Sequence, residues 1–159
     1  MLKRILLACI LFFIFYTSST SGILVSEPDT WNNGQHKDPD SKIEHIFDSD
    51  SAFYNPYFGD DKTIYDLSFE FYIRKIIHIL IYSFLAFLIF LNLPKIRFRF
   101  IVTFLLTVFI SFLDEANQFN TYGRSGRLWD VVLDSTAAFI TLLWVFVFYL
   151  IYKKSKKFK

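Results

Sequence analysis

Ionisable and polar side chains recur at helical spacing within three apolar stretches of the sequence. His78 and Tyr82 are four residues apart, so on a helix they share one face, with Ala86 one turn further on. A second face repeats a hydroxyl every four positions and ends in acidic and amide groups: Thr103, Thr107, Ser111, Glu115 and Gln118. A third face is small and acidic: Asp130, Asp134, Ala137 and Thr141. Such stripes predict helices that pack against one another in a membrane.

Imidazole and carboxylate groups inside apolar segments are costly and by default indicate function. Our candidate polar cluster is His78, Tyr82, Asp114, Glu115, Gln118, Arg124, Asp130 and Asp134, with Arg74, Lys75 and Arg127 as secondary members. Two interpretations stay open. The cluster is either a buried ion network in which Arg124 pairs with carboxylates, or a site that binds ligand or transfers charge. Because no nucleophile–base pair or metal-ligand spacing is diagnostic, we expect no metal or cofactor, and catalysis stays an open question.

The composition indicates a membrane protein. The chain has 159 residues, 53% of them hydrophobic, and a mean hydropathy of +0.36. A soluble globule of this size cannot bury so much apolar surface. The composition excludes disordered, collagen-like and soluble basic nucleic-acid-binding proteins, so membrane lipids rather than nucleic acid are the expected partner. The single Cys9 cannot form an internal disulfide, and we interpret it as a lipid-facing residue.

Four hydrophobic segments predict an all-α, polytopic membrane protein with four transmembrane helices in a bundle. They run from Ile5 to about Val25, from Ile76 to Leu93, from Phe100 to Leu113 and from Val131 to Tyr152. The third is only 14 residues long, about 21 Å of helix against a hydrocarbon core of about 30 Å. We therefore expect its helix to continue through Asp114, Glu115 and Gln118, which places acidic groups within the membrane.

The distribution of charge predicts that both termini are cytoplasmic. Three short stretches, 1–4, 94–99 and 153–159, hold 10 of the 17 basic residues and no acidic residue, as the positive-inside rule requires of cytoplasmic segments. Eleven of the 15 acidic residues fall between Glu27 and Glu70, on the predicted outer side. Arg74 and Lys75 also fall there, against the rule. The polar cluster then lies in the outer quarter of the cytoplasmic membrane.

This topology divides the chain into four parts. Residues 1–25 are a short cytoplasmic N-terminus and the first span, 26–73 an acidic extracytoplasmic segment, 74–152 a three-span core, and 153–159 a basic cytoplasmic tail. An alternative for the first part stays open, because the Ser/Thr run before Ser21 is also typical of a cleaved signal peptide.

Several of these residues belong to a longer pattern that resembles the signature of VanZ-like membrane proteins. That signature contains D-E-x-H-Q, P-G-R-S-G and D-x-x-x-D/N-x-x-G, preceded by R-K-x-x-H-x-x-x-Y and an F-Y-x-S-S ending of the first span. The matching segments here are 15–19, 74–82, 114–118, 123–127 and 130–138. Three positions depart from it: Asn117 stands in place of His, Tyr122 in place of Pro, and Ala137 in place of Gly.

The family's namesake is associated with low-level resistance to teicoplanin, a lipid-tailed glycopeptide that acts outside the bacterial membrane. The resemblance therefore implies a role in envelope maintenance or lipoglycopeptide resistance, by binding a lipid-tailed antibiotic or a lipid-linked cell-wall precursor at the outer leaflet. Two alternatives remain. One is a small membrane enzyme for a lipid-linked substrate, with His78 or a carboxylate as general base and Arg124 as anion clamp. The other is a purely structural subunit.

The predicted topology can be checked by labelling. With Cys9 replaced by Ala, Ser49→Cys is expected to react with a membrane-impermeant maleimide in intact cells, whereas Ser155→Cys is expected to react only after permeabilisation. Protection of residue 49 together with reaction of residue 155 would show that the orientation is inverted.

Overall fold

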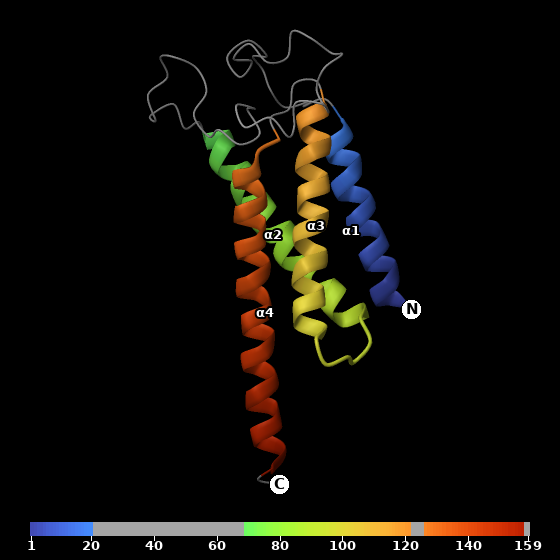
Figure 1. Cartoon of the computed structure of the whole chain (residues 1–159), viewed down its shortest axis with the longest axis vertical. Helices are drawn as coiled ribbons and strands as arrows, with labels where there is room; N and C mark the ends of the chain where they lie inside the picture. The colour runs from blue at the N-terminus through green and yellow to red at the C-terminus, as the bar shows by residue number, and fades with distance from the viewer. Residues whose placement is uncertain (21–68, 122–125, 158–159) are drawn as a thin grey trace.

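Four α-helices make up the part of the chain that the structure, a computed structural model, describes: residues 1–20, 69–121 and 126–157. They are α1 (Leu2–Ser19), α2 (Phe69–Asn92), α3 (Arg99–Asn120) and α4 (Leu128–Lys157) (Figure 1). Each is long and apolar enough to cross a membrane. The chain is therefore a multi-pass membrane protein, and over the described residues the predicted all-helical fold is confirmed, with four helices of the length and hydropathy that a span requires.

Successive helices run in opposite directions along a common bundle (Figure 1). Both α1 and α4 pack on α2 and α3, with α1 on one side of this central pair and α4 on the other. As a result, the last turns of α1 and α3 lie at the same end as the first turns of α2 and α4. We call this end, marked by Ser19, Lys75, Asn120 and Asp130, the polar end of the bundle.

The third helix continues through the acidic residues that follow its apolar stretch, as the length argument predicts. Asp114, Glu115 and Gln118 are all inside α3, and their exposed fractions are 3%, 0% and 9%. The complete helix has 22 residues, which corresponds to about 33 Å and suffices to cross the hydrocarbon core. Carboxylates are therefore buried between helices rather than exposed at a helix end.

The first helix ends at Ser19, before the expected limit near Val25, and Thr20 is extended with φ −89° and ψ 130°. A run of hydroxyl residues explains this end. Thr17 Oγ1 donates to the Phe13 carbonyl at 2.9 Å, and Ser19 Oγ donates to the Phe15 carbonyl at 2.7 Å. Hydroxyl groups that bond to the backbone compete with its own hydrogen bonds. Residues 21–25 lie outside the described part of the chain.

The helices approach closely because small and hydroxylated residues line their contacts. Ala86 and Ala138 have exposed fractions of 0%, as do the hydroxyl residues Thr103, Thr107 and Ser111 of α3. An apolar cluster continues the packing toward α1: Ile14, Tyr82, Leu85 and Ile89. Large apolar side chains remain on the outer faces, for example Phe109 at 58% exposed and Trp144 at 60%. This arrangement, with small residues inside and large ones facing lipid, is typical of membrane bundles.

Close packing at Ala138 makes it a sensitive position. Ala138→Leu inserts three carbon atoms where the exposed fraction is 0%, and overpacking of this kind costs about 1–3 kcal/mol. The variant is expected to melt earlier than the wild type in detergent. The control is Phe139→Leu on the next residue, which is 58% exposed and should melt normally. Equal melting of the two variants would contradict this close packing.

Candidate functional site

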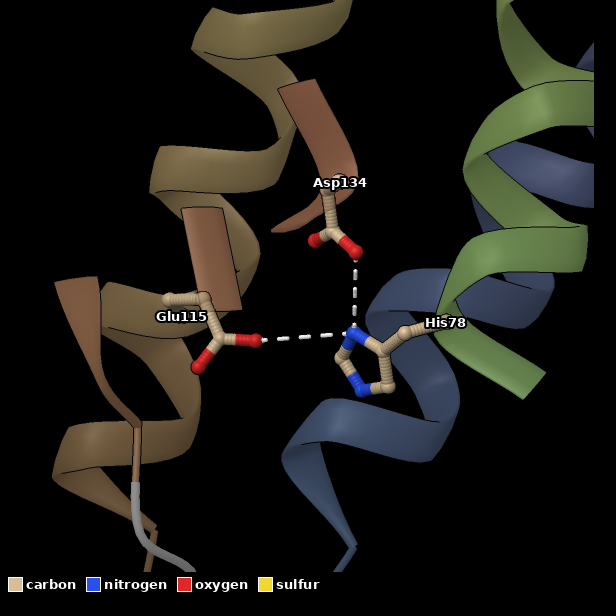
Figure 2. Close-up of side chains that lie close together, drawn as sticks. All are labelled: His78, Glu115 and Asp134. Carbon is tan, nitrogen blue, oxygen red and sulfur yellow. Dashed lines mark ion pairs between the residues drawn. The ribbon is translucent and has the colours of Figure 1, made fainter. Parts of the chain in front are cut away.

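Three ionisable side chains from three different helices meet at the polar end. His78 of α2, Glu115 of α3 and Asp134 of α4 point toward one another (Figure 2). His78 Nδ1 lies 3.4 Å from Asp134 Oδ1 and 3.7 Å from Glu115 Oε1. The side chains of Glu115 and Asp134 are 1% and 0% exposed, whereas that of His78 is 20% exposed. We call these three residues the triad.

Each carboxylate of the triad is held in place through its second oxygen. Ser111 Oγ donates to Asp134 Oδ2 at 2.7 Å. The backbone N–H of Arg127 donates to Glu115 Oε2 at 2.9 Å. In both cases the oxygen that faces His78 is the other one, so neighbouring groups fix the direction in which the carboxylates point.

Gly126 allows the Arg127 amide to reach Glu115. The glycine is buried against the last part of α3. A Cβ there would overlap the backbone carbonyl oxygen of Glu115 and lie 2.6 Å from the backbone nitrogen of Phe119. Because backbone atoms cannot move aside cheaply, only glycine fits this close approach.

A second group of buried polar side chains lies beside the triad. Tyr82 Oη donates to Asp114 Oδ2 at 2.9 Å, and Gln118 Nε2 donates to the same oxygen at 3.0 Å. The ring of Tyr82, which is 1% exposed, stacks on that of His78 with centroids 6.0 Å apart. Gln118 Nε2 also lies 3.4 Å from Glu115 Oε1. The two groups therefore form one continuous polar cluster across α2 and α3.

Lys75 and Asp130 form an ion pair at the edge of this cluster. Their side chains are 24% and 14% exposed, so the pair is partly shielded from solvent. The pair joins the second turn of α2 to the first turn of α4. The pair also offers an explanation for a lysine on the predicted outer side, where the positive-inside rule disfavours it, because Lys75 neutralises the charge of Asp130.

Most of the sequence-predicted cluster is brought together by the fold: His78, Tyr82, Asp114, Glu115, Gln118, Asp130, Asp134 and Lys75. Arg124, the expected partner of the carboxylates, lies outside the described residues. Arg74 is half-buried in the first turns of α2. Arg127 contacts the triad through its backbone amide.

Sequence reasoning missed two contributors to the site, the backbone amide of Arg127 and the glycine that positions it. It also treated Ser111 as a packing residue only. A glycine directly before Arg127 was the one available signal, because glycine often marks a close backbone approach. Neither contact could be derived from helical spacing, since both residues follow the end of α3.

The triad offers two kinds of chemistry. An imidazole beside carboxylates can accept, donate or share a proton. In addition, the three residues each provide one ligand atom, and these atoms all lie within 4.8 Å of one another. One metal ion can therefore contact all three. Nε2 of His78 is the ring nitrogen that neither ion pair involves (Figure 2).

Comparison with known proteins gave one match. The model of the family described as VanZ/LLP1 matches residues 4–152. No curated protein and no solved structure matched the chain.

The Tyr82 hydroxyl is expected to stabilise the fold through Asp114. Tyr82→Phe removes one of the two donors to Oδ2 of Asp114, a residue that is 3% exposed, and a hydrogen bond to a charged group contributes about 1.5–3 kcal/mol. The variant should show a lower melting temperature in detergent. Tyr149→Phe, at a position 55% exposed, is the matched control and should melt as the wild type does. A normal melting temperature for Tyr82→Phe would show that this hydrogen bond does not stabilise the fold.

Proposed function

The chain belongs to the VanZ/LLP1 family, and from this premise we propose that it acts at the outer surface of the cytoplasmic membrane by binding a lipid-tailed molecule. The role is envelope maintenance or low-level resistance to teicoplanin-type lipoglycopeptides. The observation that carries the proposal is the triad. A partly exposed imidazole is backed by two fully buried carboxylates at one end of an apolar bundle.

The position of the triad suits a ligand with a polar head and a lipid tail. The outer faces of the helices are covered by large apolar side chains, against which a lipid tail can lie. The polar end offers charged and hydrogen-bonding groups to a head group, and His78, Lys75 and Asp130 are among its partly exposed members. A single amphipathic molecule can contact both regions at the boundary between hydrocarbon and water.

The proposed orientation supports the same ligand class. With both termini cytoplasmic, the polar end faces outward, together with the segment that holds 11 of the 15 acidic residues. Lipid-tailed antibiotics and cell-wall precursors are both encountered on this side of the membrane, whereas an inverted orientation would present the triad to the cytoplasm.

A second candidate, a small membrane enzyme, is favoured by the arrangement around His78. Both carboxylates of the triad contact Nδ1, which leaves Nε2 outside both ion pairs (Figure 2). A carboxylate that orients an imidazole from behind is a common device of general acid–base catalysis. In this alternative the substrate is a lipid-linked envelope molecule, and His78 transfers the proton.

Replacing the imidazole tests the role of the triad. Asn is comparable in size to His and keeps hydrogen-bonding capacity, but it cannot take up a proton. His78→Asn is expected to accumulate in the membrane in normal amounts while abolishing the teicoplanin-resistance or envelope phenotype of a complemented deletion strain. Susceptibility and envelope-lipid profiles would be measured beside immunoblots of the membrane fraction.

The matched control is Ile79→Leu, which changes an exposed apolar neighbour on the same helix and should alter neither abundance nor phenotype. If His78→Asn is abundant and fully active, the triad only joins the helices, and the structural-subunit alternative is correct. Accumulation of one lipid-linked intermediate in the His78→Asn strain would instead favour the enzyme.

A further inference from the structure

We propose that the triad of His78, Glu115 and Asp134 binds a single divalent transition-metal ion of the Zn²⁺ or Mn²⁺ type. The ligands would be His78 Nδ1, Glu115 Oε1 and Asp134 Oδ1. This inference goes beyond the proposed function and does not depend on it, because it concerns the ion and not the lipid-tailed molecule.

The spacing of the ligand atoms matches a coordination shell better than a set of hydrogen bonds. Two ligand atoms that are each about 2.1 Å from a tetrahedral ion lie about 3.4 Å apart. The observed separations from His78 Nδ1 are 3.4 Å and 3.7 Å. An N–H···O hydrogen bond is shorter, at about 2.9 Å. Both separations converge on one nitrogen (Figure 2), and a single N–H cannot serve two acceptors well.

Two of the three proposed ligand atoms are buried without a hydrogen bond. Within the described residues, His78 Nδ1 and Asp134 Oδ1 have no hydrogen-bond partner, although both atoms are inaccessible to solvent. Asp134 itself is 0% exposed. Buried polar atoms normally have a hydrogen-bond partner, and a bound ion is one recognised explanation for an exception. These two atoms face each other across the centre of the triad.

The groups around the triad orient the ligands as outer partners do in metal sites. Ser111 holds Asp134 through Oδ2, and the Arg127 amide holds Glu115 through Oε2, so that the other oxygen of each faces His78. Glu115 Oε1 also accepts a long hydrogen bond from Gln118 Nε2, at 3.4 Å. Metal-ligating carboxylates are typically held in this way by a further hydrogen bond. Three protein ligands and a partly exposed histidine also leave room for a fourth ligand, the pattern of zinc sites that bind a water or a substrate.

Charge provides a further reason for a divalent cation. Glu115 and Asp134 are both fully buried, and two ionised carboxylates in a membrane interior are costly unless compensated. Lys75, the lysine of α2, pairs with Asp130. One imidazolium compensates a single charge, whereas a divalent ion compensates both carboxylates. The mixture of imidazole and carboxylate ligands suits Zn²⁺ or Mn²⁺.

The residue Asn117, which stands where the family pattern has a second histidine, does not bear on this site. Its Nδ2 donates to Ser18 Oγ at 2.7 Å and to Ser19 Oγ at 2.9 Å. Asn117 therefore faces α1 and not the triad. The three proposed ligands come from three helices, which explains why no ligand spacing is visible in the sequence.

The test uses the full-length chain in detergent, stripped with a chelator and dialysed against Zn²⁺ or Mn²⁺. His36 and His45, the two other histidines, are replaced by Ala so that His78 is the only imidazole. We expect about one metal ion per chain by elemental analysis. Pulsed electron paramagnetic resonance of the Mn²⁺ form should show coupling to a histidine nitrogen. Binding of neither metal, or bound Mn²⁺ without nitrogen coupling, would overturn the proposal.

Variants then assign the ligands. His78→Phe keeps a ring that can stack on Tyr82 but removes the nitrogen, and Asp134→Asn removes one carboxylate; each is expected to weaken metal affinity by at least about 10-fold. Asp130→Asn is the matched control, since it removes the same charge one turn away from Asp134, at a residue that pairs with Lys75 and is not a proposed ligand. Equal weakening by Asp130→Asn and Asp134→Asn would show that charge alone collects cations, and would also overturn the proposal.

Two features keep the test decisive. If His78→Phe or Asp134→Asn fails to fold, as judged by size-exclusion profile, the stoichiometry and the nitrogen coupling of the folded background protein decide the matter. Because metal content is measured on purified protein, it is also separate from the phenotype of His78→Asn. The metal proposal and the proposed function can therefore fail separately. A chain that binds metal but confers no resistance contradicts only the proposed function, and a chain that confers resistance but binds no metal contradicts only the metal proposal.

Discussion

The burial of three carboxylates inside an apolar bundle is the constraint on which the rest of this structure depends. Asp114, Glu115 and Asp134 are each no more than 3% exposed, and burying a charged group without partners costs several kcal/mol. Each therefore requires a donor, and the donors come from different places: Tyr82 of α2, Ser111 of α3 and the amide of Arg127 before α4. Meeting these requirements fixes how α2, α3 and α4 sit beside one another at the polar end.

Helical periodicity predicted which residues face the interior, but not which atoms meet. The four-residue spacing from Thr103 to Glu115 correctly indicated one buried face of α3, and the short apolar stretch correctly required the helix to continue past Leu113. Spacing says nothing about the register between helices, which is set by packing over the whole length of the bundle. For this reason the sequence could not show that Tyr82 bonds to Asp114 while His78, one turn away, faces Asp134. The contact of Lys75 with Asp130 was hidden for the same reason.

The position of α1 brings two distant segments of the family pattern, 15–19 and 114–118, into contact. Ser18 and Ser19, at the end of α1, accept hydrogen bonds from Asn117 of α3. Asn117 lies two residues after Glu115, so α1 supports the last turns of the helix that carries two of the buried carboxylates. Within the described residues, these hydrogen bonds join α1 to Asn117 and not to the triad. The first helix thus supports the end of α3, and the hydroxyl run that ends α1 supplies the acceptors.

The unequal burial of the triad separates its electrostatic role from its contact with ligands. Glu115 and Asp134 are 1% and 0% exposed through their side chains, and His78 is 20% exposed. A molecule arriving from outside the bundle therefore meets the imidazole before either carboxylate. The carboxylates determine what His78 can hold, whether a proton, a polar head group or a metal ion, and their removal disturbs packing as well as charge. His78 is consequently the position at which function can be changed while the fold is kept, and this is why the binding, acid–base and metal hypotheses all make distinct predictions for that one side chain.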